Sequence, residues 1–334
     1  MAYTDGIVSR AQTRLKRKQE AHRMERAALR EKIFKELPRT REIETALRRT
    51  APKIIAASLR QGLDGQEALA ALRKENLALQ DEEAALLDKA GYPVDALDET
   101  PLCPLCQDRG WTGMKMCDCL HTLCREEQIK DLSSMLDLKD QSFETFRLDY
   151  YDREIPQGYP RSPRENMQGV LSFCRRYAEM FGTEAPRNLI FYGPPGLGKT
   201  FLSACIARVV SERGYSVVYD SVANIFTRFE TRRFAPYGEE SRLAGEDTQR
   251  YLACDLLIMD DLGTEFLSPF FQSVLYELIN TRLAEGKQTI ISTNLEKTEW
   301  RKRYTPQVVS RLEGEYTALA FYGQDIRKLK KQQR

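Results

Sequence analysis

The sequence predicts an α/β protein: a C-terminal domain with a mainly parallel five-stranded sheet, preceded by an α-helical module and a small metal-binding segment. Three observations support this fold class. A glycine-rich phosphate loop at residues 193–200 follows a short apolar run and precedes a helical one. Helical and apolar runs then alternate toward the end of the chain, which is typical of a parallel sheet. Five of the eight cysteines lie between residues 103 and 124.

The composition places the chain among ordinary globular proteins. Hydrophobic residues make up 42% and charged residues 30% of 334 residues, which is enough for two or three domains. No apolar run approaches the roughly 18 residues that span a bilayer, and residues 1–6 hold no hydrophobic signal core. We therefore expect a cytoplasmic protein with no membrane partner. The net charge of +2 does not by itself indicate a polyanionic partner.

The chain divides into four predicted parts: a helical partner-binding module (1–98), a zinc-binding segment (99–125), a linker that ends in prolines (126–164) and a nucleotide-binding domain (165–334). A long exposed helix is expected over residues 8–37. Leucines at heptad-like spacing over residues 69–86 span too few heptads for a coiled coil and favour a small antiparallel helical module. Basic residues outnumber acidic ones over residues 10–49, which fits either a solvated helix face or a surface for a protein or nucleic-acid partner.

The cysteine-rich stretch predicts a structural zinc site. Two pairs of cysteines, separated by ten residues that include glycines, can bring four thiolates around one tetrahedral Zn²⁺. The expected ligands are Cys103, Cys106, Cys117 and Cys119. His121 or Cys124 can replace one of them. The alternatives are free thiols without metal, or a redox pair, although no thioredoxin-like strand and helix surround the motif.

The phosphate loop predicts binding of a nucleoside triphosphate with Mg²⁺. Its glycines let successive backbone N–H groups and the start of the next helix point at phosphate. Lys199 adds a charge near the β- and γ-phosphates, and Thr200 offers a hydroxyl to Mg²⁺. The expected nucleotide-binding residues are Gly193, Pro194, Pro195, Gly196, Leu197, Gly198, Lys199 and Thr200.

Polar residues at the ends of two later apolar runs complete the expected site. A buried strand is expected within residues 254–263, and it ends in two carboxylates, Asp260 and Asp261. Asp260 is expected to hold Mg²⁺, directly or through water, and Asp261 to orient or deprotonate the attacking water. Asn294 ends a strand over residues 288–294 and can reach the γ-phosphate or that water. Other strands are expected over residues 188–192, 215–219 and 316–321, and helices over 166–181, 201–210 and 269–284.

In this order the motifs resemble those of AAA+ ATPases, and more narrowly the helicase loaders of the DnaC/DnaI type and their IstB-like relatives. The resemblance covers roughly residues 160–330. It aligns residues 193–200 with Walker A, 260–263 with Walker B, 292–294 with sensor 1, 310–312 with the arginine finger and 325–327 with sensor 2. It thereby implies an ATPase that uses ATP and Mg²⁺. It also implies that Arg311 reaches the nucleotide of a neighbouring subunit and Arg327 the nucleotide of its own.

The zinc-bearing helical front is similar to that of DnaI-like loaders, and the resemblance implies a function. A loader binds the hexameric replicative helicase through its N-terminal part, self-associates through its ATPase domain and contacts single-stranded DNA. Asp261 stands where AAA+ proteins at large have glutamate, so a slow, switch-like hydrolysis is expected.

Two other functions stay open. One is an IstB-like transposition helper or phage-encoded ATPase that acts with a recombinase on DNA, and the other is an adaptor in which nucleotide only orders a scaffold. The residues expected to contact DNA form a further open question, because they suit either a single-strand groove or an amphipathic helix with its rings buried. These residues are Phe226, Arg228, Phe229, Arg232, Arg233 and Phe234.

Overall fold

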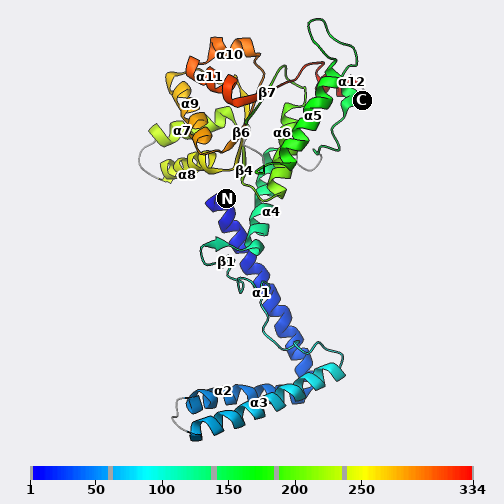
Figure 1. The fold of residues 1–334 in the computed structure, drawn as a ribbon, viewed down its shortest axis with the longest axis vertical. Helices are drawn as coiled ribbons and strands as arrows, with labels where there is room; N and C mark the ends of the chain where they lie inside the picture. The colour runs from blue at the N-terminus through cyan, green and yellow to red at the C-terminus, as the bar shows by residue number, and fades with distance from the viewer. Residues whose placement is uncertain (1–2, 59–62, 137–140, 184–187, 235–238, 333–334) are drawn as a thin grey trace. The chain divides into compact units, whose positions relative to one another are not determined.

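A five-stranded parallel sheet forms the centre of the C-terminal part of the chain (Figure 1). The computed structural model describes residues 3–58, 63–136, 141–183, 188–234 and 239–332. Residue contacts separate a unit formed by Gln12–Leu120 from a second unit formed by Met1–Ala11 and His121–Arg334. Among the described helices, none has both the length and the apolar content needed to cross a bilayer.

The strand order brings the expected site residues to one edge of the sheet. The strands are β3 (Asn188–Tyr192), β4 (Val217–Ser221), β5 (Leu256–Leu262), β6 (Gln288–Thr293) and β7 (Tyr316–Ala320). Their order is β4-β5-β6-β3-β7, and each pairing is parallel. Because β5, β6 and β3 are neighbours, their carboxyl ends meet at the same edge. The predicted α/β fold class with a five-stranded parallel sheet is confirmed.

Two strands begin later than the sequence pattern predicts. The second and third expected strands started at Tyr215 and Cys254, whereas β4 and β5 start at Val217 and Leu256. Just before the two strands, the side chain of Asp255 binds Ser216, and the regular backbone pairing of β4 with β5 starts after these residues. Asp255 Oδ2 accepts hydrogen bonds from the backbone N–H of Ser216 at 2.9 Å and from its hydroxyl at 2.8 Å. This side-chain contact fixes where the pairing of the two strands begins.

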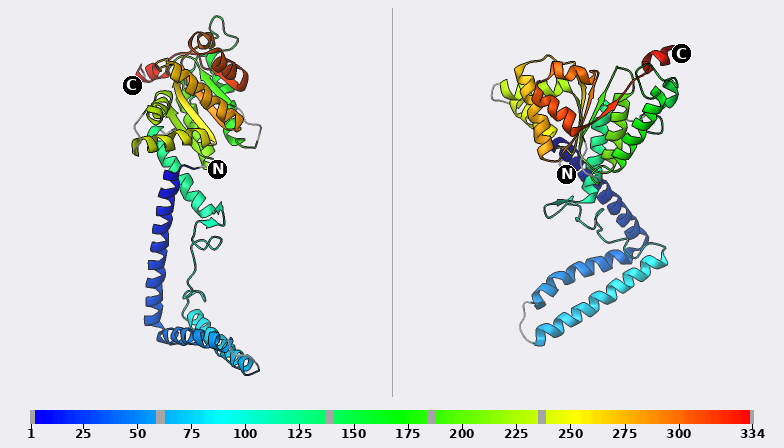
Figure 2. Two further views of the ribbon diagram at one scale, coloured as in Figure 1. Left: turned by 90° about the vertical axis from the view of Figure 1, so that its left-hand side faces the viewer. Right: turned by 45° about the horizontal axis from the view of Figure 1, so that its top comes forward.

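Helices cover both faces of the sheet (Figures 1 and 2). One face carries α5 (Pro163–Glu179) and α6 (Lys199–Glu212), and the other carries α7 (Val222–Phe234), α8 (Glu239–Ala253), α9 (Pro269–Ala284), α10 (Lys297–Arg303) and α11 (Pro306–Glu315). Three of these helices start with proline after a hydroxyl residue whose side chain accepts a backbone N–H, namely Ser162, Ser268 and Thr305. The last helix is α12 (Ile326–Gln332).

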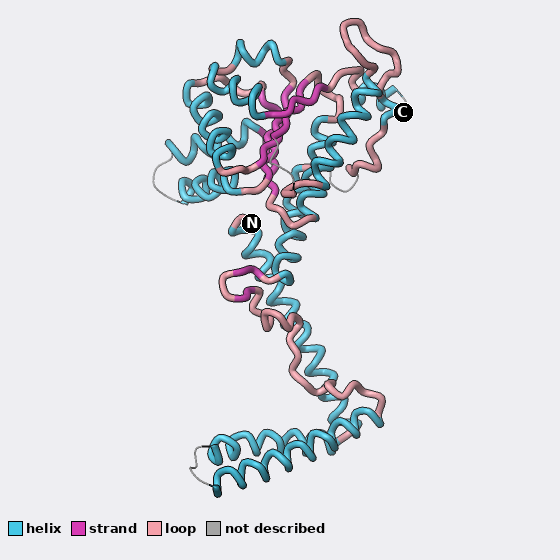
Figure 3. Tube along the Cα trace, in the orientation of Figure 1, coloured by secondary structure: helices cyan, strands magenta, loops and turns pink. Residues whose placement is uncertain are grey.

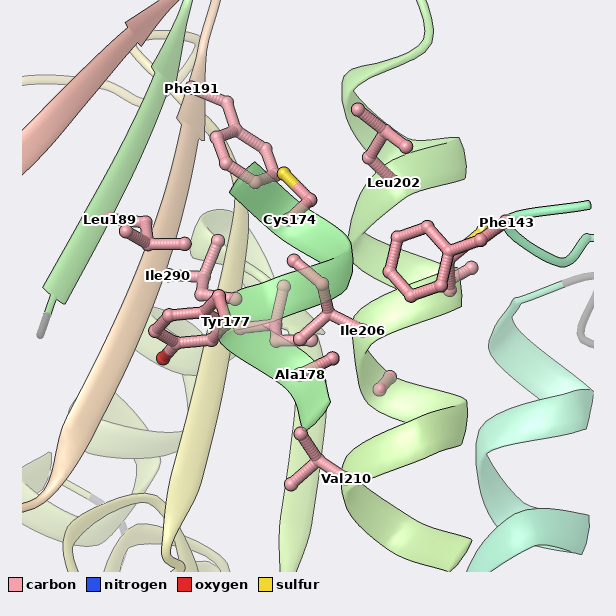
Figure 4. Packing of buried hydrophobic residues seen from close by; sticks show 14 of the residues in the cluster. Phe143, Cys174, Tyr177, Ala178, Leu189, Phe191, Leu202, Ile206, Val210 and Ile290 are labelled. Carbon is pink, nitrogen blue, oxygen red and sulfur yellow. The ribbon is translucent and has the colours of Figure 1, made fainter. Parts of the chain in front are cut away.

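One hydrophobic cluster joins α5 and α6 to the sheet (Figure 4). The stretch expected to be a linker, residues 126–164, belongs to the same cluster. It contains the end of α4 (Asp118–Met135) and the short helix η1 (Leu148–Tyr150), and it buries Leu132, Leu136, Phe143 and Tyr151 there. Leu132 and Leu136 keep a helical spacing, but Phe143 and Tyr151 follow no helical or strand period, so the sequence pattern did not reveal the burial of these two rings. The four-part division of the chain stays a prediction.

The unit Gln12–Leu120 is mainly helical, as expected. It contains most of α1 (Asp5–Glu36), together with α2 (Pro38–Ser58) and α3 (Leu63–Lys89). Helices α2 and α3 lie side by side (Figure 3). Ile33, Leu87 and Ala96 form a small buried cluster, and several basic residues pair with acids of the same unit, such as Arg39 with Glu82 at 2.8 Å. A hairpin of β1 (Trp111–Thr112) and β2 (Lys115–Met116) lies between the two cysteine pairs.

Candidate nucleotide site and cysteine cluster

A cavity of about 430 Å³ lies over the phosphate loop. Its lining comes from segments that are far apart in sequence: residues 195–201, the ends of β5 and β6, residues 141–151 and α12. Nine expected site residues line it, namely Pro195, Gly196, Leu197, Gly198, Lys199, Thr200, Asp261, Asn294 and Arg327. The structure therefore brings together groups that the sequence placed on different strands and helices.

Two glycines allow the path of the phosphate loop. Gly193 has φ +125° and Gly196 has φ +78°, values that L-residues with a side chain rarely adopt. A Cβ on Gly193 would lie 2.0 Å from the carbonyl oxygen of Phe321, and one on Gly196 would lie 2.0 Å from Oδ1 of Asp325. The loop is thus in close contact with the chain that follows β7, and a side chain at either position would force these segments apart.

The backbone of the loop is also held from two directions. The hydroxyl of Tyr151 donates a 2.9 Å hydrogen bond to the carbonyl of Leu197. The N–H of Ile326 donates a 3.0 Å bond to the carbonyl of Gly196. Helix α6 begins at Lys199, within the last two residues of the loop, so its free N–H groups lie beside the cavity. The geometry is that of an anion-binding loop.

Lys199 is nearly buried, with 6% of its surface exposed. Its Nζ donates to the carbonyl oxygens of Gly193 and Pro194 at 2.5 and 2.8 Å, and to Oδ1 of Asn294 at 2.8 Å. Burial lowers the pKa of Lys199 to about 8, although Asp261 and Asp260 act in the opposite direction. The three described hydrogen-bond acceptors of this ammonium group are neutral, and phosphate oxygens can replace them.

Asp260 is buried behind the cavity and accepts hydrogen bonds from three hydroxyl groups. The hydroxyl of Thr200 lies 3.2 Å from its Oδ2, and that of Tyr219 lies 2.5 Å from the same atom. The hydroxyl of Ser292 binds Oδ1. The pair of Thr200 and Asp260 offers the oxygen ligands that Mg²⁺ prefers. Tyr219 on β4 was not anticipated, because its position depends on strand register.

Asp261 enters the cavity because β5 is irregular at this point. Consecutive strand residues normally face opposite sides of a sheet, but the pairing of β5 with β6 shifts register between Met259 and Leu262. Asp261 has φ +60°, and the bulge turns its side chain toward the cavity. Its N–H donates to the hydroxyl of Ser292 at 3.1 Å. Burial raises the pKa of Asp261, and the charge of Asp260 adds to this effect.

The two arginines implied by the family resemblance lie in different places. Arg327, on α12, lines the cavity. Arg311, on α11, does not belong to the lining residues; its guanidinium donates to Oδ1 of Asn280 at 3.0 Å and lies 3.6 Å from Glu315. Contact of Arg327 with its own nucleotide and of Arg311 with a neighbour's both stay predictions.

Helix α7 supports the amphipathic alternative for most of its aromatic and basic residues. Phe226 is buried and Phe229 packs against the same hydrophobic cluster. Arg228 pairs with Asp247 at 3.3 Å, and Arg232 donates to the hydroxyl of Thr248 at 2.9 Å. The end of the helix is different. There, the guanidinium of Arg233 lies 5.7 Å from the ring centroid of Phe234 and 5.4 Å from that of Phe270, and Phe234 is 67% exposed.

The four expected zinc ligands lie together. The sulfur atoms of Cys103, Cys106, Cys117 and Cys119 are all within 4.8 Å of one another, and among the described residues they form the one such group of three or more possible ligands. The Sγ atoms are 3.7 Å apart in the Cys103–Cys117 pair and 3.5 Å apart in the Cys106–Cys119 pair. Zn–S bonds of about 2.3 Å in a tetrahedron give S–S separations of about 3.8 Å. The four thiols therefore fit zinc.

His121 and Cys124, the alternative ligands, follow the cluster in the sequence and are not part of it. The N–H of Gly110 donates to Sγ of Cys106 at 3.2 Å, as outer-shell donors do in thiolate sites. Nδ1 of His121 lies 3.3 Å from the hydroxyl of Tyr3, and Cys124 is buried. Neither His121 nor Cys124 belongs to the described group of converging ligand atoms.

The family model that matches the chain is that of the IstB-like ATP binding proteins, over residues 175–312. The matched range includes the phosphate loop, both β5 acids and Asn294. Residues 175–312 of the chain are therefore similar to the IstB-like ATP binding proteins. Residues of this matched range line the cavity over the phosphate loop, namely 195–201, Asp261 and Asn294.

The chain is similar to proteins that are named for different functions. The replicative helicase loader DnaC of Escherichia coli K12 is 30% identical over 149 residues, which cover 44% of this chain and 58% of the loader. An insertion sequence ATP-binding protein of Sinorhizobium fredii is 32% identical over 115 residues, covering 34% of this chain and 36% of that protein. The chain thus spans little more than half of the length of the loader that it matches.

Among solved structures, the crystal structure of the DnaC helicase loader aligns with a TM-score of 0.41 and 22% identity, covering 54% of this chain and 98% of that chain. The crystal structure of DnaI aligns with a TM-score of 0.42 and 17% identity, covering 57% and 92%.

Proposed function

We propose that the chain is an ATP-dependent loader that places a hexameric replicative helicase on single-stranded DNA and uses slow ATP hydrolysis as an assembly switch. The observation that carries this proposal is the presence of an N-terminal unit outside the family match. Gln12–Leu120 is compact by itself, whereas the match begins at residue 175. This unit exposes apolar side chains, such as Leu105 at 73% and Met114 at 100%, which suits a partner protein.

In the proposed reaction, water attacks the γ-phosphorus and ADP leaves, and each residue at the sheet edge has one task. Lys199 brings positive charge to the β- and γ-phosphates. Thr200 and Asp260 hold Mg²⁺, which neutralises phosphate charge when bound. Asp261 orients or deprotonates the attacking water from the cavity wall. Asn294, now bound to Lys199 Nζ, contacts the γ-phosphate or the water after Lys199 exchanges partners.

In the proposed assembly, self-association through the ATPase domain brings Arg311 of one subunit to the nucleotide site of the next. Arg311 lies outside the cavity lining of its own chain, so we assign it to the nucleotide of the neighbouring subunit, with Arg327 acting in its own. Mixing Arg311→Ala with Lys199→Ala chains tests this assignment, because each variant supplies what the other lacks. Restored ATPase activity is expected. Activity that never exceeds that of the separate variants, while wild-type chains associate, contradicts it.

For single-stranded DNA we propose the exposed end of α7 as a contact. Arg233 and Phe234 lie there beside Phe270, and rings with an adjacent cation suit the stacking of bases. The double variant Arg233→Ala, Phe234→Ala should weaken binding of a labelled oligonucleotide measured by fluorescence anisotropy. Arg228→Ala is the matched control, since this arginine is paired with Asp247.

A second candidate function is that of a transposition or phage-encoded helper that acts with a recombinase, and the match to IstB-like proteins favours it. Purification of the tagged full-length chain with ATP from its native cells separates the two. Retention of a hexameric helicase supports the loader, and retention of a transposase or a preference for duplex DNA supports the helper. A Lys199→Ala chain that keeps full function would indicate an adaptor instead.

A further inference from the structure

We infer that Tyr219 is a positioning residue for the metal ion of the nucleotide site. Its hydroxyl holds the carboxylate of Asp260 in the orientation that binds Mg²⁺. Tyr219 lies on β4, away from the phosphate loop and the acids of β5 in the sequence, and its hydroxyl donates to Oδ2 of Asp260 at 2.5 Å. The inference rests on the proposed assignment of Mg²⁺ to Thr200 and Asp260, and it adds the group that orients one of these two ligands.

The register of β4 and β5 brings the tyrosine to the carboxylate. Tyr219 is paired with Ile258, and Asp260 lies two residues further along β5. Positions two residues apart on a strand face the same side of a sheet, so Tyr219 and Asp260 are diagonal neighbours on one face. Diagonal neighbours are about 7–8 Å apart, which is within the reach of aromatic and long side chains. The length of tyrosine is therefore what delivers a hydroxyl from β4 to Asp260.

Both the ring of Tyr219 and the strand that carries it are held in place. The ring is partly buried and packs against the hydrophobic cluster that joins α5 and α6 to the sheet. The start of β4 is bound by the side chain of Gln128 on α4. Its Oε1 accepts the N–H of Val217 at 3.0 Å, and its amide group donates to the carbonyl of Tyr215 at 2.8 Å. A hydroxyl supported in this way has a defined position, as a group that orients a metal ligand requires.

Asp260 is held from both neighbouring strands. Tyr219 on β4 donates to Oδ2, and Ser292 on β6 donates to Oδ1. The hydroxyl of Thr200 lies 3.2 Å from Oδ2, so Tyr219 fixes the oxygen that faces the other expected Mg²⁺ ligand. Without the phenol hydroxyl, Oδ2 would keep only the longer bond from Thr200, and the carboxylate would be less firmly oriented. Groups that orient a metal ligand are typically worth about tenfold or more in metal affinity.

The test measures how much Mg²⁺ strengthens nucleotide binding, which does not depend on turnover. ADP is titrated by calorimetry into the full-length chain, once with excess Mg²⁺ and once with EDTA. The ratio of the two affinities is the magnesium factor, and by reciprocity it equals the factor by which the site strengthens binding of Mg²⁺ to ADP. Tyr219→Phe should lower the magnesium factor about tenfold and leave the affinity for metal-free ADP unchanged.

Tyr251→Phe is the matched control, because it removes a tyrosine hydroxyl from a different buried carboxylate. The hydroxyl of Tyr251 donates at 2.7 Å to Asp220, which also lies on β4 and is 6% exposed. The magnesium factor of this variant should equal that of wild type. An equal drop in Tyr251→Phe and Tyr219→Phe would show that loss of any such hydroxyl disturbs the site, and it would overturn the inference.

A double variant shows whether Tyr219 acts through Asp260. Asp260→Asn should lower the magnesium factor by itself, and adding Tyr219→Phe should change it no further; a further drop overturns the inference. If Asp260→Asn lowers the factor but Tyr219→Phe leaves it unchanged or raises it, the inference is wrong and the proposed metal site stands. An equal loss of affinity with and without Mg²⁺ in Tyr219→Phe would show a structural role and overturn the inference as well. A wild-type chain whose ADP affinity does not depend on Mg²⁺ would contradict both the metal site and the inference.

Discussion

The cysteine cluster and the nucleotide cavity are both arranged for a ligand, but they are supported in opposite ways. The cavity rests on a sheet whose central residues, including Leu189 and Ile290, are fully buried. The cysteine cluster is flanked by strands of only two residues each, and Leu105 and Met114 around it are exposed. A metal would therefore contribute folding free energy to the cluster, whereas a nucleotide adds to a fold that already exists.

The largest effect is expected where the ligand contributes to folding. Cys106→Ser should remove the zinc, which we expect at about one per chain, because structural zinc sites contribute on the order of 10 kcal/mol. Limited proteolysis should then cut within Gln12–Leu120, while nucleotide binding stays nearly unchanged. Metal content is measured by mass spectrometry. Cys124→Ser is the control and should keep its zinc, since its thiol is outside the cluster. Absence of metal from carefully purified wild-type protein would contradict the assignment.

At the nucleotide cavity we expect a substitution to impair ATP binding or turnover while the fold is kept. Lys199→Ala should weaken ATP binding or lower turnover by roughly 10³-fold or more, because it removes positive charge from the phosphates. The melting temperature should not fall, since burial of this ammonium is unfavourable and lowers its pKa to about 8. Lys297→Ala, at an exposed lysine, is the matched control. A cooperative loss of the fold in Lys199→Ala would remove the contrast between the two sites.

A smaller and more selective effect is expected from Asp261→Asn. The variant should bind ATP with near wild-type affinity and hydrolyse it about 10²-fold more slowly, because only the group that acts on water is lost. Asparagine tolerates a positive φ about as well as aspartate, so the backbone at +60° is preserved. Single-turnover hydrolysis and equilibrium binding measure the two quantities. Normal turnover in this variant would show that another group positions the water.

The smallest effect is a dependence of ATP affinity on pH. The pKa of Lys199 is about 8 without ligand, and contact with phosphate should raise it, so binding above pH 8 takes up a proton. Affinity should be flat below about pH 8 and fall above it, by at most about tenfold per pH unit. Calorimetry at pH 9 in two buffers with different ionisation enthalpies measures the uptake. Equal heats in both buffers would show that phosphate does not contact Lys199.

The sequence predicted those parts of the sites that are local in the chain. The phosphate loop occupies eight consecutive residues, and the four cysteines lie within 17 positions, so their residue types and spacing were sufficient. The aromatic wall of the cavity was missed because Phe146 and Tyr151 find their partners in distant segments and follow no regular period. The hydroxyl of Tyr219 on Asp260 depends on the register between β4 and β5, which the sequence does not display.

The left-handed backbone at Asp261 also restricts how this protein can evolve. At φ +60° short polar residues and glycine are tolerated, and longer side chains are disfavoured. A mutation to glutamate, the acid that would extend closer to the water, would meet this strain before it could improve the chemistry. Selection for faster turnover would therefore have to change the β5 bulge and the acid together. Two simultaneous changes are rare, so the bulge itself tends to preserve aspartate at position 261 across generations.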